Sequence, residues 1–208
     1  MPKVLEKVER RFGEKLFIKG ERCLGPKCAH ARRPSPPGVH GKKAGRKRAP
    51  SLFGQLLFEK QKVRFFYGLD DREIRRYSNE AAERKGMFQA ELLRLLESRL
   101  DNALYRLGII ESRRASRQMI SHGQVMVNGR GVYSPSFRVR RGDTISLKAR
   151  AWNAPLLEDQ ARRMSTYQPP AWLAFDPESR TGRVIGEPTA EEIGITVDTI
   201  KIKEFYSR

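Results

Sequence analysis

The chain has 208 residues, of which 38% are hydrophobic, and a net charge of +18. Its ten Phe and six Tyr residues argue against a wholly disordered chain, and its length allows one large domain or two smaller ones. A positive charge of this size predicts a polyanionic partner. No apolar run approaches the roughly 18 residues of a membrane span, and the N-terminus lacks the apolar segment of a secretion signal. We therefore expect a cytosolic protein with no membrane partner.

The excess positive charge falls in two blocks of the sequence. Residues 1–50 carry a net charge of +11 and residues 99–150 carry +8. By contrast, residues 51–98 carry +1 and residues 151–208 carry −2. Because the charge is concentrated instead of spread evenly, the two basic blocks predict two regions of contact with the polyanion.

Residues 1–50 are predicted to form a basic, extended N-terminal arm. The first 16 residues are highly charged and could form a helix. Residues 32–50, RRPSPPGVHGKKAGRKRAP, consist largely of Pro, Gly, Lys and Arg. Such a composition cannot build a hydrophobic core, so we expect this stretch to be extended and mobile by itself.

Three helices are predicted after the arm, forming a small helical domain. Ser51 and Gly68 suit the start and the stop of the first helix, and Asp70 and Gly86 those of the second. In the third, over residues 88–100, leucines recur at helical spacing.

From Leu104 onward the pattern changes to short helices and strands. Asn-Gly between two apolar runs is a strong hairpin signal, and it occurs here at residues 128–129. The runs predict strands over residues 124–127, 133–139 and 144–147.

The last part of the chain is predicted to hold a helix near residues 156–164 and strands around 171–175 and 183–185. The tail, VDTIKIKEFYSR, is ambiguous by pattern. Its Ile-Lys-Ile-Lys alternation is typical of a strand, whereas Asp198 could cap a helix.

Residues 112–122 are predicted to form a short basic helix with two different faces. Ser112 suits the N-cap, and Gly123 suits the left-handed position that follows a helix. At about 100° per residue the polar side chains fall within one arc of about 140°. That arc holds Arg113, Arg114, Arg117, Gln118 and Ser121, and the opposite side holds Ala115, Met119 and Ile120. Arginine binds phosphate oxygens through two parallel hydrogen bonds and also stacks on bases, so the polar face predicts phosphate contacts.

The alternative interpretation is a solvated basic helix balanced by neighbouring carboxylates. Only Glu111 is near it in the sequence, and further basic residues add to the same charge. These are Arg99, Arg106, Arg130, Arg138, Arg140 and Arg141. The balance of charge therefore favours an anionic partner.

A resemblance to a known family narrows the partner to RNA. The string LESRLDNALYRLGIIESRRASRQMISHGQVMVNGR, followed by SPSFRVRRGD, closely resembles the RNA-binding module first described in ribosomal small-subunit protein four. This module also occurs in tyrosyl-tRNA synthetases, pseudouridine synthases and a heat-shock RNA-binding protein. Outside it, RRPSPPGVHGKK, FEKQKVRFFYG and EFYSR resemble segments of the ribosomal protein in the same order.

The resemblance implies an α+β fold, with a helical domain into which the RNA-binding module is inserted. The module would hold short helices and a small, mainly antiparallel β-sheet. The implied domains are the arm (1–50), the helical domain (51–98, completed by a helical tail over 199–208) and the RNA-binding module with its β-sheet extension (99–198).

The resemblance also implies a function, that of a structural constituent of the small ribosomal subunit in the cytoplasm. Such a protein would bind small-subunit rRNA at a multi-helix junction and nucleate assembly of the body of the subunit. It would contribute to translational accuracy through contact with neighbouring ribosomal protein five, and would lie near the path by which mRNA enters. The alternatives are an RNA-binding regulator and the targeting module of an RNA-modifying enzyme. The 58 residues after Arg150 are too few for a separate catalytic domain.

Candidate RNA-binding residues follow from the resemblance and from the basic blocks. In the module they are Arg99, Arg106, Ser112, Arg113, Arg114, Arg117, Gln118, His122, Gly123, Asn128, Gly129, Arg138 and Arg140. In the arm they are Arg32, Arg33, His40, Lys42, Lys43, Arg46, Lys47 and Arg48.

Cofactors and catalytic residues are not expected. Many relatives hold a structural zinc ion with two cysteine pairs, and this chain keeps only the second pair, Cys23 and Cys28. The first pair falls on Glu6 and Glu9, whose hard carboxylates are poor replacements for thiolates. The sequence shows no nucleophile–base pair and no phosphate-binding glycine loop. We therefore predict neither an enzyme nor a small-molecule substrate.

Overall fold

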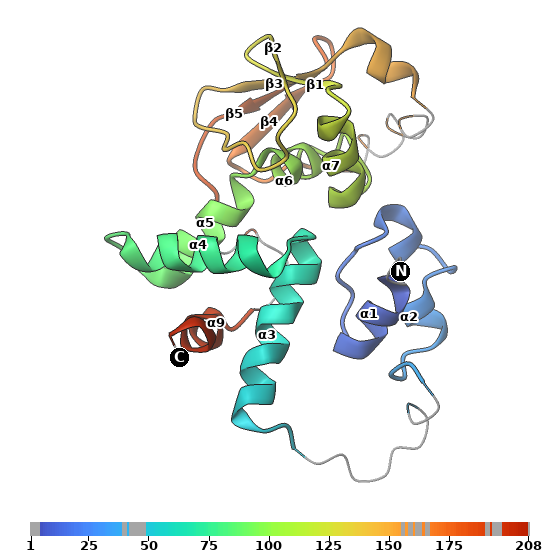
Figure 1. The fold of residues 1–208 in the computed structure, drawn as a ribbon. Coiled ribbons are helices and arrows are strands. Elements are labelled where there is room, and N and C mark those ends of the chain that lie inside the picture. Colours follow the sequence, from blue (N-terminus) through green and yellow to red (C-terminus); the bar gives the residue numbers. More distant parts are fainter. Residues whose placement is uncertain are drawn as a thin grey trace. The chain divides into compact units, whose positions relative to one another are not determined.

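The computed structural model describes residues 5–38, 41, 49–154, 157, 160, 164, 167–189, 192 and 197–207. The chain divides into two compact units, Met1–Gln89 with Ile195–Arg208, and Ala90–Gly194. The described residues contain helices and one antiparallel sheet (Figure 1), which confirms the predicted α+β class. The division falls at residues 89–90, whereas the sequence predicted a boundary at residues 98–99.

The beginning of the predicted arm is folded, and its helix α1 (Leu5–Phe12) agrees with the helix that the charged first 16 residues allowed. The same part contains the 3-10 helix η1 (Gly20–Cys23) and the short helix α2 (Ala29–Arg32). Phe12, Leu16 and both cysteines are buried. These apolar residues are widely spaced in a charged sequence. Their sequence pattern therefore shows no periodicity that would predict a shared core. The predicted helix at residues 156–164 lies mostly outside the described residues.

The helices that follow begin and end as their capping residues predict. Helix α3 (Leu52–Tyr67) starts at Ser51, whose Oγ accepts from the Gly54 amide at 3.2 Å, and stops at Gly68 with φ +67°. Helix α4 (Asp71–Glu83) has a complete capping box in which Asp70 and Glu73 exchange hydrogen bonds of 2.7 and 3.0 Å. It ends before the predicted Gly86.

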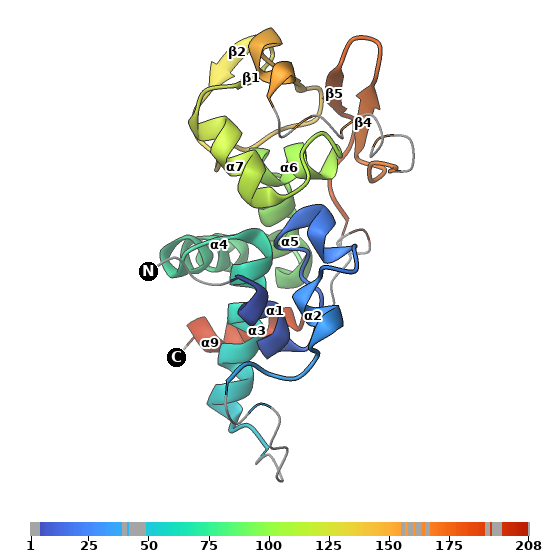
Figure 2. The same cartoon turned by 90° about the vertical axis from the view of Figure 1, so that its right-hand side faces the viewer.

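The C-terminal tail is a helix, α9 (Thr199–Tyr206), which packs on α3 and α4 (Figures 1 and 2). Its N-cap is Asp198, whose side chain accepts from the Lys201 amide at 3.2 Å. The interpretation as a strand is wrong, because the two isoleucines of the Ile-Lys-Ile-Lys stretch do not share one buried face. Ile202 is fully buried, and Ile200 is 73% exposed on another face of the helix.

The second unit contains most of α5 (Phe88–Glu97) and all of α6 (Leu100–Arg106) and α7 (Arg113–Ser121). The sequence predicted one helix over residues 88–100, but the chain breaks it at Ser98. The backbone there pairs with a distant segment, since Val139 N donates to Ser98 O at 2.9 Å and Leu100 N donates to Phe137 O at 2.8 Å. This long-range pairing has no signal in the local pattern.

The sheet has the strand order β2-β1-β3-β5-β4, and its paired strands are antiparallel. Its strands are β1 (Val125–Val127), β2 (Arg130–Val132), β3 (Thr144–Leu147), β4 (Leu173–Asp176) and β5 (Thr181–Val184). The predicted hairpin is confirmed, with Asn128 at φ +51° and Gly129 at φ +75°. The predicted strand over residues 133–139 is wrong: the strand after the hairpin is β2, and the chain then turns toward Ser98 and Leu100.

One hydrophobic core holds the second unit together. It joins leucines of α6 and Met119 and Ile120 of α7 to inward-facing residues of the sheet such as Val125 and Ile145. Figures 1 and 2 both place α6 and α7 on one side of the sheet. Helix α7 is therefore fixed along its apolar side, as its sequence pattern predicts.

Candidate nucleic-acid interface

Helix α7 has the ends that its sequence predicts. Ser112 Oγ accepts from the Ala115 amide at 3.3 Å, and Gly123 follows the helix with φ +67°. A Cβ at Gly123 would meet the ring of Tyr133, an exposed side chain that would have to move aside, so the left-handed conformation is the main reason for glycine here. The exposed face presents Arg114, Gln118 and Ser121, and His122 after the helix is also exposed.

A buried carboxylate positions two of the candidate arginines. Asp101 accepts from Arg99 Nε at 3.0 Å and from Arg99 Nη2 at 2.8 Å. Its Oδ2 also accepts from Arg117 Nε at 3.2 Å and Nη2 at 3.0 Å. The Arg117 side chain remains 31% exposed, whereas those of Arg99 and Asp101 are 1% and 3% exposed. Asp101 therefore fixes the orientation of a guanidinium that solvent can still reach.

A second buried carboxylate, Glu97, organises the other side of the module. Arg106 donates to both of its oxygens, at 3.0 and 3.1 Å, and Asn102 Nδ2 donates to Oε2 at 2.7 Å. Asn102 Oδ1 in turn accepts from Arg113 Nε at 2.6 Å. The Arg113 guanidinium also lies 4.4 Å from the centre of the Tyr105 ring. The network is thus continuous from Arg106 to Arg113.

Two of the candidate arginines in these networks are buried. Arg99 is 1% exposed and Arg113 is 8% exposed. Arg113 is therefore not on an open face as the helical arc predicted, and the candidate Arg99 is buried as well. The helical-wheel argument failed for Arg113 because it counted only nearby acids such as Glu111. Asp101 and Glu97, from earlier in the sequence, supply the balancing charge.

The turn of the β1–β2 hairpin is held by hydrogen bonds between Asn128 and the start of β3. Asn128 Nδ2 donates to Asp143 Oδ1 at 2.8 Å, and Asn128 Oδ1 accepts from the Thr144 amide at 2.8 Å. Asp143 Oδ2 accepts from the Arg140 amide at 2.7 Å. Asn128, Gly129 and Arg130 remain exposed at the tip. The side chain of Asn128 thus fixes the turn that carries the candidate Gly129.

The remaining candidates lie in different places. Arg140 is exposed. Arg138 is half-buried, and its backbone forms an isolated antiparallel β-bridge with that of Arg99. Arg32 and Arg33 are exposed at the end of α2, in the other unit. The described residues do not include His40, Lys42, Lys43, Arg46, Lys47 or Arg48.

Sequence reasoning missed two sets of exposed side chains that suit RNA. Tyr133 is 65% exposed, with Lys148 Nζ 6.0 Å from its ring centre. Exposed aromatic rings beside cations are stacking platforms for bases, and an aromatic residue in a basic stretch was the available signal. On α4, three arginines are exposed; they are Arg72, Arg75 and Arg76. The near-zero net charge of residues 51–98 concealed this ridge.

The comparisons with known proteins identify the family. Residues 5–97 match the ribosomal protein S4/S9 N-terminal domain, and residues 98–145 match the S4 domain. The small ribosomal subunit protein uS4 of Thermus thermophilus is 45% identical over 199 residues, which is 96% of this chain and 94% of that protein. The chain belongs to the ribosomal protein uS4 family. Its uS4 relatives from Syntrophomonas wolfei and Natranaerobius thermophilus are 42% and 43% identical over the same shares.

Membership of the uS4 family confirms the predicted resemblance. The two matched regions also contain the hydrogen-bond networks of Asp101 and Glu97. The S4-domain match contains Asp101, all of α7 and the β1–β2 hairpin, and it ends in β3. The Glu97 carboxylate comes from the last residue of the N-terminal-domain match. The two matched regions are therefore joined by the hydrogen bonds of Glu97 to Arg106 and Asn102.

The cysteine pair of this uS4 family member does not fit a zinc site. The carboxylate of Glu9, 2% exposed, accepts from the Ile18 amide at 3.1 Å and from Cys23 Sγ at 3.5 Å. Burial, aided by the charge of Glu9, raises the pKa of Cys23 to about 11. The thiol donates to Glu9, and with the first cysteine pair absent the chain offers two thiol ligands where a structural zinc site uses four Cys or His ligands. Among the described residues no group of three or more acidic, His or Cys side chains could hold a metal. The side chain of Glu6 is not among those described.

None of the described helices has the length and apolar character needed to cross a membrane.

Proposed function

We propose that this chain binds small-subunit rRNA through the segment of α7 and the β1–β2 hairpin, residues 112–130. The chain is a structural protein of the small ribosomal subunit and not an enzyme, like the uS4 proteins to which it is similar. It acts in the cytoplasm, in the ribosome.

The observation that carries this proposal is the fixed orientation of Arg117 beside the exposed Arg114. Arg117 is held by Asp101 through two hydrogen bonds and keeps about a third of its side chain exposed. A positioned guanidinium loses less conformational freedom on binding phosphate than a free one. A-form RNA hides its major groove, so a rigid helix-and-hairpin suits recognition of backbone shape and exposed bases.

The roles of the candidate residues divide accordingly. Arg114, Arg117, Gln118, His122 and Gly129 are proposed to contact RNA, as are Arg140 and the arm residues Arg32 and Arg33. The buried Arg99 and Arg113, the paired Arg106 and the capping Ser112 support the surface from inside.

We further propose a role in assembly of the subunit. A surface whose side chains are already fixed by buried carboxylates can bind rRNA without prior ordering by another protein. This supports a primary binder that nucleates the body of the subunit. The family resemblance supports contact with ribosomal protein five, an effect on translational accuracy, and proximity to the path by which mRNA enters.

Binding of the purified chain to a transcript of the small-subunit rRNA, with no other protein present, tests the proposal. We expect saturable binding that weakens steeply with salt, and co-sedimentation with small subunits through a high-salt wash. A requirement for other ribosomal proteins would contradict the role of a primary binder. Absence from washed small subunits would contradict the ribosomal function itself.

A further inference from the structure

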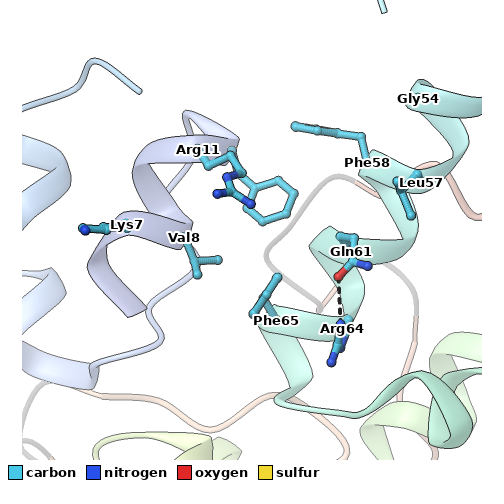
Figure 3. A pocket seen from close by; sticks show the side chains of 10 residues that line it. Lys7, Val8, Arg11, Gly54, Leu57, Phe58, Gln61, Arg64 and Phe65 are labelled. Atoms are coloured by element: carbon cyan, nitrogen blue, oxygen red, sulfur yellow. Dashed lines mark hydrogen bonds between the residues drawn. The ribbon is translucent and has the colours of Figure 1, made fainter. Parts of the chain in front are cut away.

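A groove in the first unit lies between α1 and α3 and combines aromatic walls with positive charge. Its volume is about 670 Å³, within the range of roughly 300–1,000 Å³ for small-ligand sites. Figure 3 shows Val8 and Arg11 from α1 facing Phe58 and Phe65 from α3. Lys7, also from α1, is a further lining residue.

Three phenylalanine rings form the apolar wall. Phe12 lies 4.9 Å from Phe58 and 6.0 Å from Phe65, measured between ring centres, with interplanar angles of 59° and 58°. Phe12 is 9% exposed and so belongs to the core, whereas Phe58 remains 39% exposed. Since the rings are tilted and not stacked, the accessible face of Phe58 can still receive a flat ligand.

The charge of the groove favours an anionic ligand. The described residues that line it include Lys7, Arg11 and Arg64, and none of these described residues is a carboxylate. Arg64 is partly engaged, because it donates to Gln61 Oε1 at 3.2 Å and to Leu69 O at 3.3 Å, and its Nη1 lies 3.9 Å from Asp71 Oδ1. Arg11 is exposed, and within the described part of the chain it has no carboxylate partner. Arg11 is therefore the cation best placed to meet a ligand in the groove.

We infer that this groove binds one unpaired nucleotide of the RNA, with its base against Phe58 and Phe65 and its phosphate at Arg11. A nucleotide joins a flat π-surface to a negative charge, which is the combination that aromatic walls and an unpaired guanidinium recognise. The inference rests on the proposed function for the identity of the RNA. The residues that line the groove belong to the N-terminal-domain match and not to the S4-domain match that contains the residues proposed above.

The test compares two exposed phenylalanines of the same helix in the full chain. Phe58→Leu removes the ring in the groove, and Phe53→Leu is the matched control, because Phe53 lies outside the groove and packs 5.8 Å from Phe205. The probe is a transcript of the whole small-subunit rRNA. We expect Phe58→Leu to weaken binding by about 5- to 100-fold, and Phe53→Leu to stay within about twofold of the unsubstituted protein.

Ultraviolet cross-linking of the unsubstituted complex, followed by mass spectrometry, should attach a single nucleotide to Phe58. A third variant, Arg11→Gln, changes an exposed side chain and so keeps the test valid if Phe58→Leu unfolds. Its salt dependence of binding should be shallower by about 0.7–0.9 in the logarithmic slope.

The outcomes separate this inference from the proposed function. If the unsubstituted protein does not bind the transcript, both are overturned. If it binds, but Phe58→Leu and Arg11→Gln match the control and no nucleotide is attached to Phe58, the groove is not a nucleotide site and the proposed function stands. Cross-links from Phe58 to another ribosomal protein in reconstituted subunits would assign the groove to a protein partner and also overturn the inference.

Discussion

Replacing Asp101 by Asn should destabilise the second unit strongly, because it removes the charge that balances a buried arginine. Asp101 accepts four hydrogen bonds from two guanidiniums, and the Arg99 side chain is only 1% exposed. Breaking a buried ion pair by removing one partner costs about 3–5 kcal/mol, because the other charge stays buried. We expect a loss of that size, or a fall in Tm of roughly 6–20 °C for a protein of this length.

Urea unfolding, followed by circular dichroism, measures the effect of Asp101→Asn. The control is Arg117→Gln, which removes the half-exposed partner and should cost only about 0–1 kcal/mol. The double variant Arg99→Met/Asp101→Leu replaces the buried pair with apolar side chains of similar size, and it should recover most of the lost stability. An Asp101→Asn variant as stable as the unsubstituted protein would refute the reasoning, as would a double variant less stable than Asp101→Asn.

Three further predictions concern the RNA surface, the end of α7 and the cysteine site. Arg114→Ala should lower the logarithmic salt slope of rRNA binding by about 0.7–0.9 and leave the urea midpoint unchanged, because the side chain is exposed; an unchanged slope would place Arg114 away from phosphate. Gly123→Ala should cost about 1–3 kcal/mol in urea unfolding, since φ is +67° and a Cβ meets Tyr133; a neutral effect would contradict this constraint. The fold raises the pKa of Cys23 from 9.0 to about 11. The protonated Cys23 thiol therefore contributes stability that is complete below pH 9 and is lost as the pH rises through 11. Unfolding midpoints should therefore fall over this interval, by less in Cys23→Ala; an equal fall in both proteins would show that Cys23 is not the cause.

Local chemistry made several elements of the fold predictable from the sequence. Ser51, Asp70 and Ser112 each cap the helix that follows them. In each case the side-chain oxygen accepts a hydrogen bond from the backbone amide three residues later. The hairpin at Asn128 and Gly129 was equally readable, because both residues tolerate positive φ. Such signals depend only on neighbours along the chain.

Long-range contacts explain what the sequence did not reveal. Arg113 looked exposed because its partner, Asn102, lies on another helix and is itself held by Glu97. The break at Ser98 results from pairing with Val139, far along the chain. At the N-terminus, Glu9 and Cys23 meet only after the chain has folded back. In each case the two partners are eleven or more residues apart, beyond the reach of periodicity and capping rules.

The central claim is that residues 112–130 face small-subunit rRNA, and a photo-cross-link from the exposed Gln118 tests it most directly. Gln118→Cys can be labelled selectively with benzophenone, because Cys23 and Cys28 are buried. After assembly of the labelled protein into small subunits, irradiation should attach it to a short, contiguous set of rRNA nucleotides. Attachment only to proteins, or no attachment in subunits that contain the labelled chain, would contradict the claim.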